Sequence, residues 1–279
     1  MPNLRAALVE ATARLEHSDT ATLDAQLLLA HILGKSRTWL YTWPAHELDA
    51  DQHAAFDALI ARAAAGEPVA YLTGKRAFWT MTLDVTPAVL IPRPETELLV
   101  ELALQAGKAL SGPVADLGTG SGAIALALAS EREDWQVHAS DSSPGALQVA
   151  AANAERLGYT NVRFFHGSWC EPLPAERYSL IVSNPPYISD NDPHLPALRF
   201  EPQSALVAME GGMADLRTLA TDARSHLADS GWLLLEHGWR QGEAVRALLD
   251  ALGYNDVATH LDCGNRDRVT LARWRGQSG

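Results

Sequence analysis

The sequence predicts an α/β fold: a mostly parallel, doubly wound sheet with a C-terminal antiparallel hairpin, preceded by a small helical bundle. Three observations predict this fold. Apolar residues recur at helical spacing up to Gly74, strands and helices alternate from Pro113 onward, and two strand-like segments flank a turn at residues 263–267. Alternation of this kind is typical of parallel sheets that are covered by helices on both faces.

Composition limits the function classes. The chain has 279 residues, 47% of them hydrophobic, which suits one large domain or one medium and one small domain. Its formal net charge of −12, without any run of Lys and Arg, disfavours direct binding of a nucleic-acid backbone. Cys170 and Cys263 lack zinc-site spacing and are interpreted as small buried hydrophobes, so no metal site is predicted.

The amino terminus gives no sign of membrane targeting. Residues 1–5 lack the apolar core of a signal peptide, and no uninterrupted apolar segment is long enough to span a bilayer. We therefore expect a cytoplasmic protein that has no membrane association.

Residues 1–74 are expected to form the helical bundle. Four helical segments are predicted, near residues 4–15, 18–34, 36–43 and 51–66. No metal, nucleophile or phosphate motif lies within them. Trp39, Tyr41 and Trp43 are interpreted as core and rim packing rather than a ligand cage. The functional alternative is a docking module that holds a macromolecular substrate.

A connector is predicted over residues 75–94. Residues 77–85 alternate in part with period two and predict a short hairpin, and Val89–Ile91 predicts a short apolar strand. Pro94 then opens a helix that ends near Gly107. Before any resemblance is considered, Arg93 and the glutamates after it are interpreted as a solvated helix start.

Residues 95–279 are predicted to form the doubly wound domain. Strands are expected at residues 114–117, 135–139, 162–165, 178–183, 232–236, 256–261 and 268–272. Helices are expected at residues 124–129, 144–157, 213–227 and 241–252, with a long loop over residues 188–208. The last two strands form the hairpin.

A glycine-rich turn follows the first strand of this domain. Asp116-Leu117-Gly118-Thr119-Gly120-Ser121-Gly122 lets the backbone turn tightly and lets a ligand approach the helix amino terminus. With Ala123 it also matches a dinucleotide pattern, so a nicotinamide oxidoreductase is an alternative. Asp141 ends the second strand, where a carboxylate can accept both hydroxyls of an adenosine ribose. Asp116 would repel a pyrophosphate but suits the ammonium and sulfonium of S-adenosylmethionine.

Ser183-Asn184-Pro185-Pro186-Tyr187 ends the fourth strand of this domain, at residues 178–183. The Asn184 side-chain oxygen and the Pro185 carbonyl can accept both hydrogens of a planar NH2 group, and the prolines stiffen the chain that carries them. Tyr187 adds a flat wall. This suits orientation of an amide or amine nitrogen for attack on an electrophile, although Asn and Pro are also common turn residues.

Together these motifs resemble class I S-adenosylmethionine-dependent methyltransferases, and within them the peptide chain release factor glutamine methyltransferases of the HemK/PrmC type. The resemblance covers nearly the whole chain. Besides the bundle and the two motifs above, it rests on Ile91-Pro92-Arg93-Pro94-Glu95-Thr96-Glu97, Asp192-Pro193-His194, Arg199-Phe200-Glu201-Pro202 and Leu235-Glu236-His237-Gly238. Asn-Pro-Pro-Tyr is shared with adenine and guanine amine methyltransferases, so it indicates chemistry rather than substrate.

The resemblance implies a set of site residues. Those implied to bind the cofactor are Asp116, Gly118, Thr119, Gly120, Ser121, Gly122, Asp141, Trp169 and Asn184. Those implied to hold the glutamine of a Gly-Gly-Gln motif are Asn184, Pro185, Pro186 and Tyr187, of which Asn184, Pro185 and Tyr187 are the catalytic set. Ser140 departs from the apolar residue that is more usual before the acid.

The expected reaction is direct transfer of the sulfonium methyl group to the glutamine amide nitrogen, which leaves S-adenosylhomocysteine. No general base is assigned, because His194 and His237 are interpreted as histidines satisfied by local hydrogen bonds. Bacterial release factors are the expected partners, and the enzyme is expected to act as a monomer. The alternatives are a methyltransferase for amines of DNA or RNA, a ribosomal-protein glutamine methyltransferase, and a non-catalytic scaffold.

Overall fold

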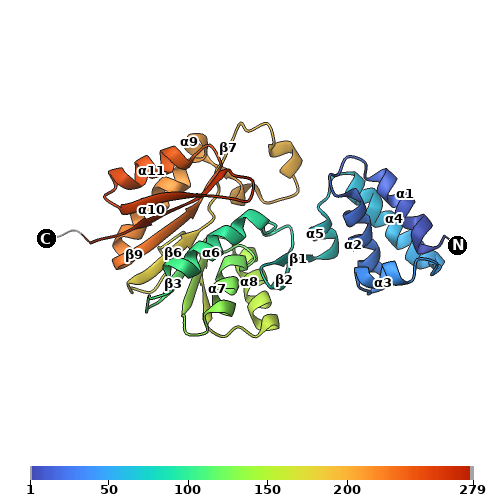
Figure 1. The fold of residues 1–279 in the computed structure, drawn as a ribbon, viewed down its shortest axis with the longest axis horizontal. Helices are drawn as coiled ribbons and strands as arrows, with labels where there is room; N and C mark the ends of the chain where they lie inside the picture. The colour runs from blue at the N-terminus through green and yellow to red at the C-terminus, as the bar shows by residue number, and fades with distance from the viewer. Residues whose placement is uncertain (1, 277–279) are drawn as a thin grey trace. The chain divides into compact units, whose positions relative to one another are not determined.

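Two compact units make up the chain, Met1–Lys75 and Arg76–Gly279, in a computed structural model that describes residues 2–276. Each unit has its own hydrophobic core. Residues 76–94, expected as a connector, belong to the second unit. The first unit is helical and the second contains the sheet (Figure 1).

The first unit consists of α1 (Leu4–Arg14), α2 (Ala21–Leu33), α3 (Arg37–Thr42), α4 (Ala50–Ala64) and α5 (Val69–Thr73). The first four confirm the predicted helices, and local signals set their ends. Asn3 caps α1 by accepting a hydrogen bond from the Ala6 amide, and α2 ends at Gly34 in the left-handed region. The sequence analysis missed α5, because it is only five residues long and directly follows Pro68.

The aromatic residues of α3 and its end differ in their exposure. Leu40 is buried in the bundle core and Trp39 is half-buried, but Tyr41 is 64% and Trp43 is 57% exposed. Tyr41 and Trp43 therefore lie at the rim of the bundle rather than in its core, and the Tyr41 hydroxyl donates to the buried Gln26 at 2.9 Å. A six-residue helix directs consecutive side chains to different sides, so only part of it can face the core.

A seven-stranded sheet forms the centre of the second unit. Its order is β10–β11–β9–β6–β3–β4–β5, and the five strands from β9 to β5 run parallel. The strands are β3 (Val114–Leu117), β4 (Val137–Asp141), β5 (Val162–His166), β6 (Tyr178–Ser183), β9 (Leu227–Glu236), β10 (Asn255–Leu261) and β11 (Asp267–Arg273). β10 and β11 form the antiparallel hairpin, which pairs with β9. The predicted fold class is confirmed.

Helices cover both faces of this sheet (Figure 1). One core contains side chains from α6 (Glu97–Ala106), α7 (Ala123–Glu131) and α8 (Pro144–Leu157), and the other contains those from α10 (Ala214–His226) and α11 (Gly242–Ala251). Within β6, Leu180 and Val182 join the first core while Ile181 joins the second. The continuous apolar run of β6 is thus explained by burial on both faces.

A hairpin of β1 (Lys75–Phe78) and β2 (Met81–Asp84) precedes the sheet, as predicted. The strand predicted at Val89–Ile91 is wrong: these residues form a loop before the 3₁₀ helix η1 (Pro94–Thr96). Two of these apolar residues are nevertheless buried, Val89 at 1% and Ile91 at 5% exposure, and Leu90 is half-buried. A short apolar run indicates burial, but it does not by itself indicate pairing in a sheet.

The segment predicted as a long loop contains short regular elements. They are β7 (Ile188–Ser189), η2 (Leu195–Leu198), η3 (Gln203–Ala205), β8 (Val207–Ala208) and α9 (Met209–Gly212). β7 and β8 pair in parallel, so the two ends of the segment are joined beside the strand end that carries Asn184. Elements of two to four residues leave no periodic signal in the sequence.

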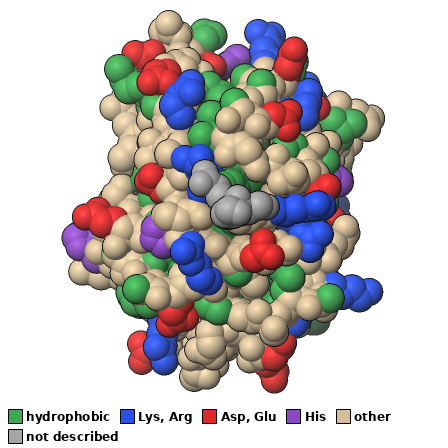
Figure 2. Space-filling model, turned by 90° about the vertical axis from the view of Figure 1, so that its left-hand side faces the viewer, with side chains coloured by type: hydrophobic (Ala, Val, Ile, Leu, Met, Phe, Trp, Pro, Cys, Tyr) green, Lys and Arg blue, Asp and Glu red, His purple; other side chains and the backbone are tan. Residues whose placement is uncertain are grey.

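Cys170 is buried as expected, but Cys263 is exposed in the turn between β10 and β11, so the buried interpretation of Cys263 was wrong. Within residues 2–276, no helix is both long and apolar enough to cross a membrane. Acidic and basic side chains are interspersed on the face that Figure 2 shows, rather than gathered in a patch of one sign.

Candidate active site

Two cavities adjoin at the carboxyl ends of the parallel strands. The larger, of about 290 Å³, is lined by Ala88, Val89, Leu90, Gly118, Gly120, Asp141, Ser142, Ser143, Ala146, Ser168, Trp169, Asn184, Pro186, Pro202, Ser204, Ala205 and Asp215. The smaller, of about 130 Å³, is lined by Leu90, Arg93, Asn184, Pro185, Tyr187, Ile188, Leu198, Ala205 and Leu206. Leu90, Asn184 and Ala205 belong to both walls. Ligands of open α/β sheets bind at this edge.

The glycine-rich turn joins β3 to α7, and only part of it lines the larger cavity. Gly118 and Gly120 lie on the cavity wall at φ +75° and +56°. Gly122 is buried instead, where an added Cβ would lie 3.1 Å from Leu126 of α7. Thr119 and Ser121 are also buried. Thr119, Ser121 and Gly122 therefore lie within the turn and line neither cavity.

Asp116 lies behind the turn and lines neither cavity. It is fully buried, and its Oδ2 accepts hydrogen bonds from the Thr119 hydroxyl at 2.7 Å and the Ala125 amide at 3.1 Å. Its Oδ1 has no hydrogen-bond partner within the protein. Burial raises the pKa of Asp116 to about 7, although both hydrogen bonds oppose the shift.

Asp141 and Trp169 bring two further strand ends to the larger cavity. The Asp141 carboxylate accepts from the Gly120 amide at 2.9 Å and from the Ser143 amide at 2.8 Å, which fixes it at the end of β4. Trp169 follows β5 with φ +48°, and its carbonyl accepts a hydrogen bond from the Ser140 hydroxyl at 2.7 Å. The unusual Ser140 thus holds the backbone of Trp169 in place.

Asn184 stands between the two cavities. Its Nδ2 donates to the Thr96 hydroxyl at 3.1 Å, which leaves its oxygen as the open acceptor. Ser183, one residue earlier, is fully buried and donates to the Leu117 carbonyl at 2.6 Å, so β6 is tied to β3 at its end. Pro185 lines the smaller cavity and Pro186 the larger.

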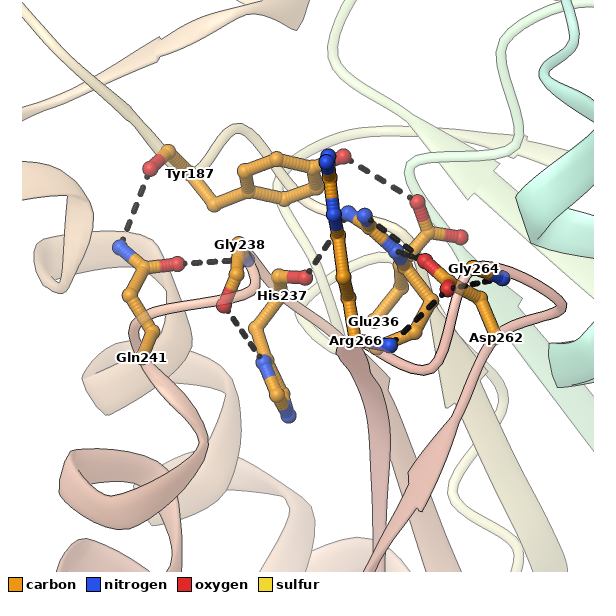
Figure 3. A network of polar contacts seen from close by, with 9 residues as sticks. Tyr187, Glu236, His237, Gly238, Gln241, Asp262, Gly264 and Arg266 are labelled. Atoms are coloured by element: carbon orange, nitrogen blue, oxygen red, sulfur yellow. Dashed lines mark hydrogen bonds and ion pairs between the residues drawn. The ribbon is translucent and has the colours of Figure 1, made fainter.

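Tyr187 is held at both its backbone and its ring (Figure 3). Gln241 donates to the Tyr187 carbonyl at 3.1 Å, and the Tyr187 hydroxyl donates to the buried Glu236 carboxylate at 3.3 Å. Gly212 approaches the same carbonyl so closely that an added Cβ would lie 2.1 Å from it, and its φ is +88°. Glycine is therefore required at position 212.

Arg93 joins two segments that are far apart in the sequence. Its guanidinium pairs with Glu201, which is 7% exposed and also accepts a hydrogen bond from the Ile91 amide at 3.1 Å. Interpretation of Arg93 as part of a solvated helix start was therefore wrong. Glu97 is likewise engaged, because it accepts from the Trp79 amide at 2.9 Å.

The two histidines differ in their surroundings. His237 is buried, with Nε2 2.7 Å from the Thr270 hydroxyl and Nδ1 3.0 Å from the Gly238 carbonyl, and burial lowers its pKa. The expectation of local hydrogen bonds is confirmed for His237. His194 is exposed and is not among the residues that line either cavity.

Several lining residues were missed in the sequence analysis. Val89 and Leu90 come from the segment misinterpreted as a strand, Ala88 directly precedes it, and Pro202, Ser204 and Ala205 come from the segment treated as a loop. Leu198 and Leu206 complete the smaller cavity. The Arg-Phe-Glu-Pro stretch was the available signal, since it lies directly beside these residues in the chain.

Comparison with known proteins identifies the family of this chain. Residues 6–74 match the PrmC N-terminal domain, and residues 94–203 match the methyltransferase small domain. The release factor glutamine methyltransferase of Vibrio cholerae is 51% identical over 277 residues, 98% of this chain and 97% of that protein. The corresponding protein of Xylella fastidiosa is 52% identical over 279 residues, 99% of this chain and 100% of that protein. The chain belongs to the release factor glutamine methyltransferase family.

The release factor glutamine methyltransferase family shares its fold with other methyltransferases. A methyltransferase from Pyrococcus furiosus of known crystal structure superposes with a TM-score of 0.54 at 19% identity, covering 79% of this chain and 99% of that one. The methyltransferase small domain match spans the predicted cofactor residues that line the larger cavity, which are Gly118, Gly120, Asp141, Trp169 and Asn184, and it also spans the Asn-Pro-Pro-Tyr segment.

Proposed function

We propose that this protein transfers a methyl group from S-adenosylmethionine to the side-chain amide nitrogen of the glutamine in the Gly-Gly-Gln motif of bacterial peptide chain release factors. The observation that carries the proposal is the meeting of two cavities at Asn184. One cavity suits a nucleoside cofactor and the other a small planar amide. Membership of the release factor glutamine methyltransferase family supports the choice of acceptor.

The residues of the larger cavity fit S-adenosylmethionine. Asp141 can accept hydrogen bonds from ribose hydroxyls, and Trp169 offers an aromatic surface beside the adenine. The Oδ1 of Asp116 has no partner within the protein, and above its pKa of about 7 this buried carboxylate is negative, which favours a cationic ligand over a pyrophosphate. When bound, the cofactor supplies an electrophilic methyl group on a positively charged sulfur.

Asn184 and Pro185 would orient the acceptor in the smaller cavity. The Asn184 oxygen and the Pro185 carbonyl accept the two N–H groups of the glutamine amide, while the Tyr187 ring borders the cavity. Fixing both hydrogens directs the nitrogen lone pair toward the methyl group. The nitrogen forms a bond to carbon as the carbon–sulfur bond breaks, and it then loses one proton to water, so S-adenosylhomocysteine and N5-methylglutamine remain.

The helical bundle of residues 1–74 is proposed as the docking module for the release factor. Its exposed aromatic side chains, Tyr41 and Trp43, suit a protein surface. We further propose that the enzyme acts in the cytoplasm as a monomer on protein rather than nucleic acid, as a net charge of −12 favours.

Methyl transfer from radiolabelled S-adenosylmethionine to a purified bacterial release factor tests this function. The same factor with its Gly-Gly-Gln glutamine changed to alanine is the matched control. Label that is lost with this change supports both the chemistry and the acceptor. Label that persists identifies another residue, and label that is instead sensitive to nuclease treatment identifies a nucleic acid; either result refutes the proposal.

Asn184→Ala tests the orienting role. We expect kcat to fall on the order of 100-fold at saturating cofactor and release factor, because one of the two acceptors that hold the amide is lost. Normal turnover by this variant would refute the mechanism.

A further inference from the structure

A chain of hydrogen bonds runs from Asn184 to a buried carboxylate. Asn184 Nδ2 donates to the hydroxyl of Thr96, which is 3% exposed at the end of η1. The Thr96 hydroxyl also holds down the pKa of Glu236, the fully buried last residue of β9, as a hydrogen-bond donor to its carboxylate, in which Oε2 has no other partner among the described residues. The Tyr187 hydroxyl reaches the same carboxylate at 3.3 Å (Figure 3). Thr96 and Glu236 are therefore linked to both Asn184 and Tyr187.

The carboxylate determines the direction of every bond in this chain. An ionised carboxylate can only accept hydrogen bonds, so Thr96 must donate its single hydroxyl proton to Glu236. The lone pairs of Thr96 then receive the Asn184 NH2 group, and the Asn184 oxygen is left toward the cavities. An amide has nearly the same shape when it is flipped by 180°, so shape alone does not select this orientation.

We propose that Thr96 and Glu236 are positioning residues that set which end of the Asn184 side-chain amide faces the methyl acceptor. This inference rests on the proposed function, because the orientation matters only if Asn184 must accept a hydrogen bond from the substrate amide. A flipped Asn184 would present its own N–H groups to the N–H groups of the substrate. The glutamine would then be repelled from the reactive position.

Burial raises the pKa of Glu236 to about 7, against the hydrogen bond from Thr96, the positive charge of Arg268 on β11 and the hydrogen bond from Tyr187. Glu95, in η1, raises it further. A protonated Glu236 can donate, so Thr96 is free to turn its proton toward Asn184 and the amide can flip. The group is ionised above its pKa; we therefore expect kcat to decrease as the pH falls through about 7.

Three variants of the full chain test the proposal, with kcat and KM for a release factor measured between pH 5.5 and 9. We expect Thr96→Val to lower kcat by about 10- to 100-fold, with the dissociation constant of S-adenosylhomocysteine unchanged. Thr96→Ser, which keeps the hydroxyl, should restore kcat to within about threefold. Glu236→Gln should lower kcat and abolish its decrease at acidic pH, because the new side chain does not ionise in this range.

Thr270→Val is the matched control. Thr270 is, like Thr96, a buried threonine, but its hydroxyl is hydrogen-bonded to His237 and Thr259 instead of to Asn184 or Glu236. We expect a comparable loss of thermal stability with kcat and its pH profile unchanged. A normal kcat in Thr96→Val would overturn the proposal, and so would a Glu236→Gln variant whose kcat still decreases at acidic pH. If a variant fails to fold, the wild-type enzyme still provides a test, because a kcat that is constant between pH 5.5 and 9 would also overturn the proposal. A wild-type enzyme that binds S-adenosylhomocysteine but does not label the release factor would refute the proposed function instead.

Discussion

Gly118 is the residue of the glycine-rich turn that packs against Trp169 in the larger cavity. An added Cβ would lie 3.2 Å from the Trp169 ring, and the φ of +75° is itself unfavourable for any other residue. We expect Gly118→Ala to weaken cofactor binding by at least about tenfold, because both the ring and the turn must shift. Isothermal titration with S-adenosylhomocysteine measures this change.

Gly158 provides the control for the backbone strain alone. It ends α8 at φ +78°, and nothing lies within 4 Å of the position of an added Cβ. Gly158→Ala should cost about 1 kcal/mol of stability and leave the dissociation constant of S-adenosylhomocysteine unchanged. Equal losses of affinity in both variants would contradict a specific contact between Gly118 and Trp169.

Asp116 couples stability to pH. Burial raises its pKa from 3.8 to about 7 on folding, so the folded chain keeps a proton that the unfolded chain releases. This contribution to stability is complete below pH 3.8 and is lost as the pH rises through about 7. Between pH 5 and pH 8, we expect it to lower the free energy of unfolding by about 2 to 3 kcal/mol.

Asp116→Asn should remove this part of the pH dependence, which urea unfolding at the two pH values measures. Glu133→Gln, which changes an exposed carboxyl, is the control and should leave the wild-type dependence intact. The linkage is disproved if the decrease in stability from pH 5 to pH 8 is the same in Asp116→Asn as in the wild type.

Glu201 attaches the segment over residues 188–206 to the loop before η1 through an ion pair and a hydrogen bond. Glu201 is 7% exposed and holds both the Arg93 guanidinium and the Ile91 amide. We expect Glu201→Ala to lower the free energy of unfolding by about 2 to 3 kcal/mol, because it leaves both donors without their partner. The KM for the release factor should also rise, since Arg93 lines the smaller cavity.

Chemical unfolding and steady-state kinetics together check this prediction. Asp134→Ala is a suitable control, because it removes an exposed carboxylate from a pair with Arg132, and neither residue lines a cavity. We expect little change in stability or KM for that variant. If Glu201→Ala behaved like Asp134→Ala, the ion pair would not hold this segment.

Helices and strands were predicted correctly where their formation depends on local sequence patterns. The long helices and the buried strands were predicted because a periodicity of 3.6 or a continuous apolar run is visible without knowledge of the fold. Val89–Ile91 shows the limit: Val89 and Leu90 line the larger cavity, and the buried Ile91 donates its amide hydrogen to the distant Glu201. β7 and β8 depend on each other across 17 intervening residues, and no local pattern reports that pairing.

The proposed docking role of the bundle can be tested at its exposed aromatic side chains. We expect Trp43→Ala to raise the KM for the release factor by about five- to tenfold, because exposed aromatic residues often dominate protein interfaces. The affinity for S-adenosylhomocysteine should be unaffected. Val9→Ala shortens another exposed apolar side chain of the bundle, one that is 67% exposed, and should have little effect. An unchanged KM in Trp43→Ala would exclude this residue from docking.

The candidate site was predicted from the sequence only in part. Gly118, Asp141 and Asn184 were selected because strand ends and glycine turns mark the ligand edge of a parallel sheet. Thr96 and Glu236 carry no such local signal, and their link to Asn184 arises from residues 88 and 52 positions away in the chain. The tertiary structure is needed to show which polar side chains orient the residues that border the cavities.

The common wall of the two cavities has a consequence for inhibitor design. Because Leu90, Asn184 and Ala205 border both, an adenosine-like group and a primary amide bound side by side could be joined by a short linker. The second group would then bind intramolecularly, at an effective concentration on the order of millimolar. A bisubstrate compound of this kind should bind far more tightly than either half alone.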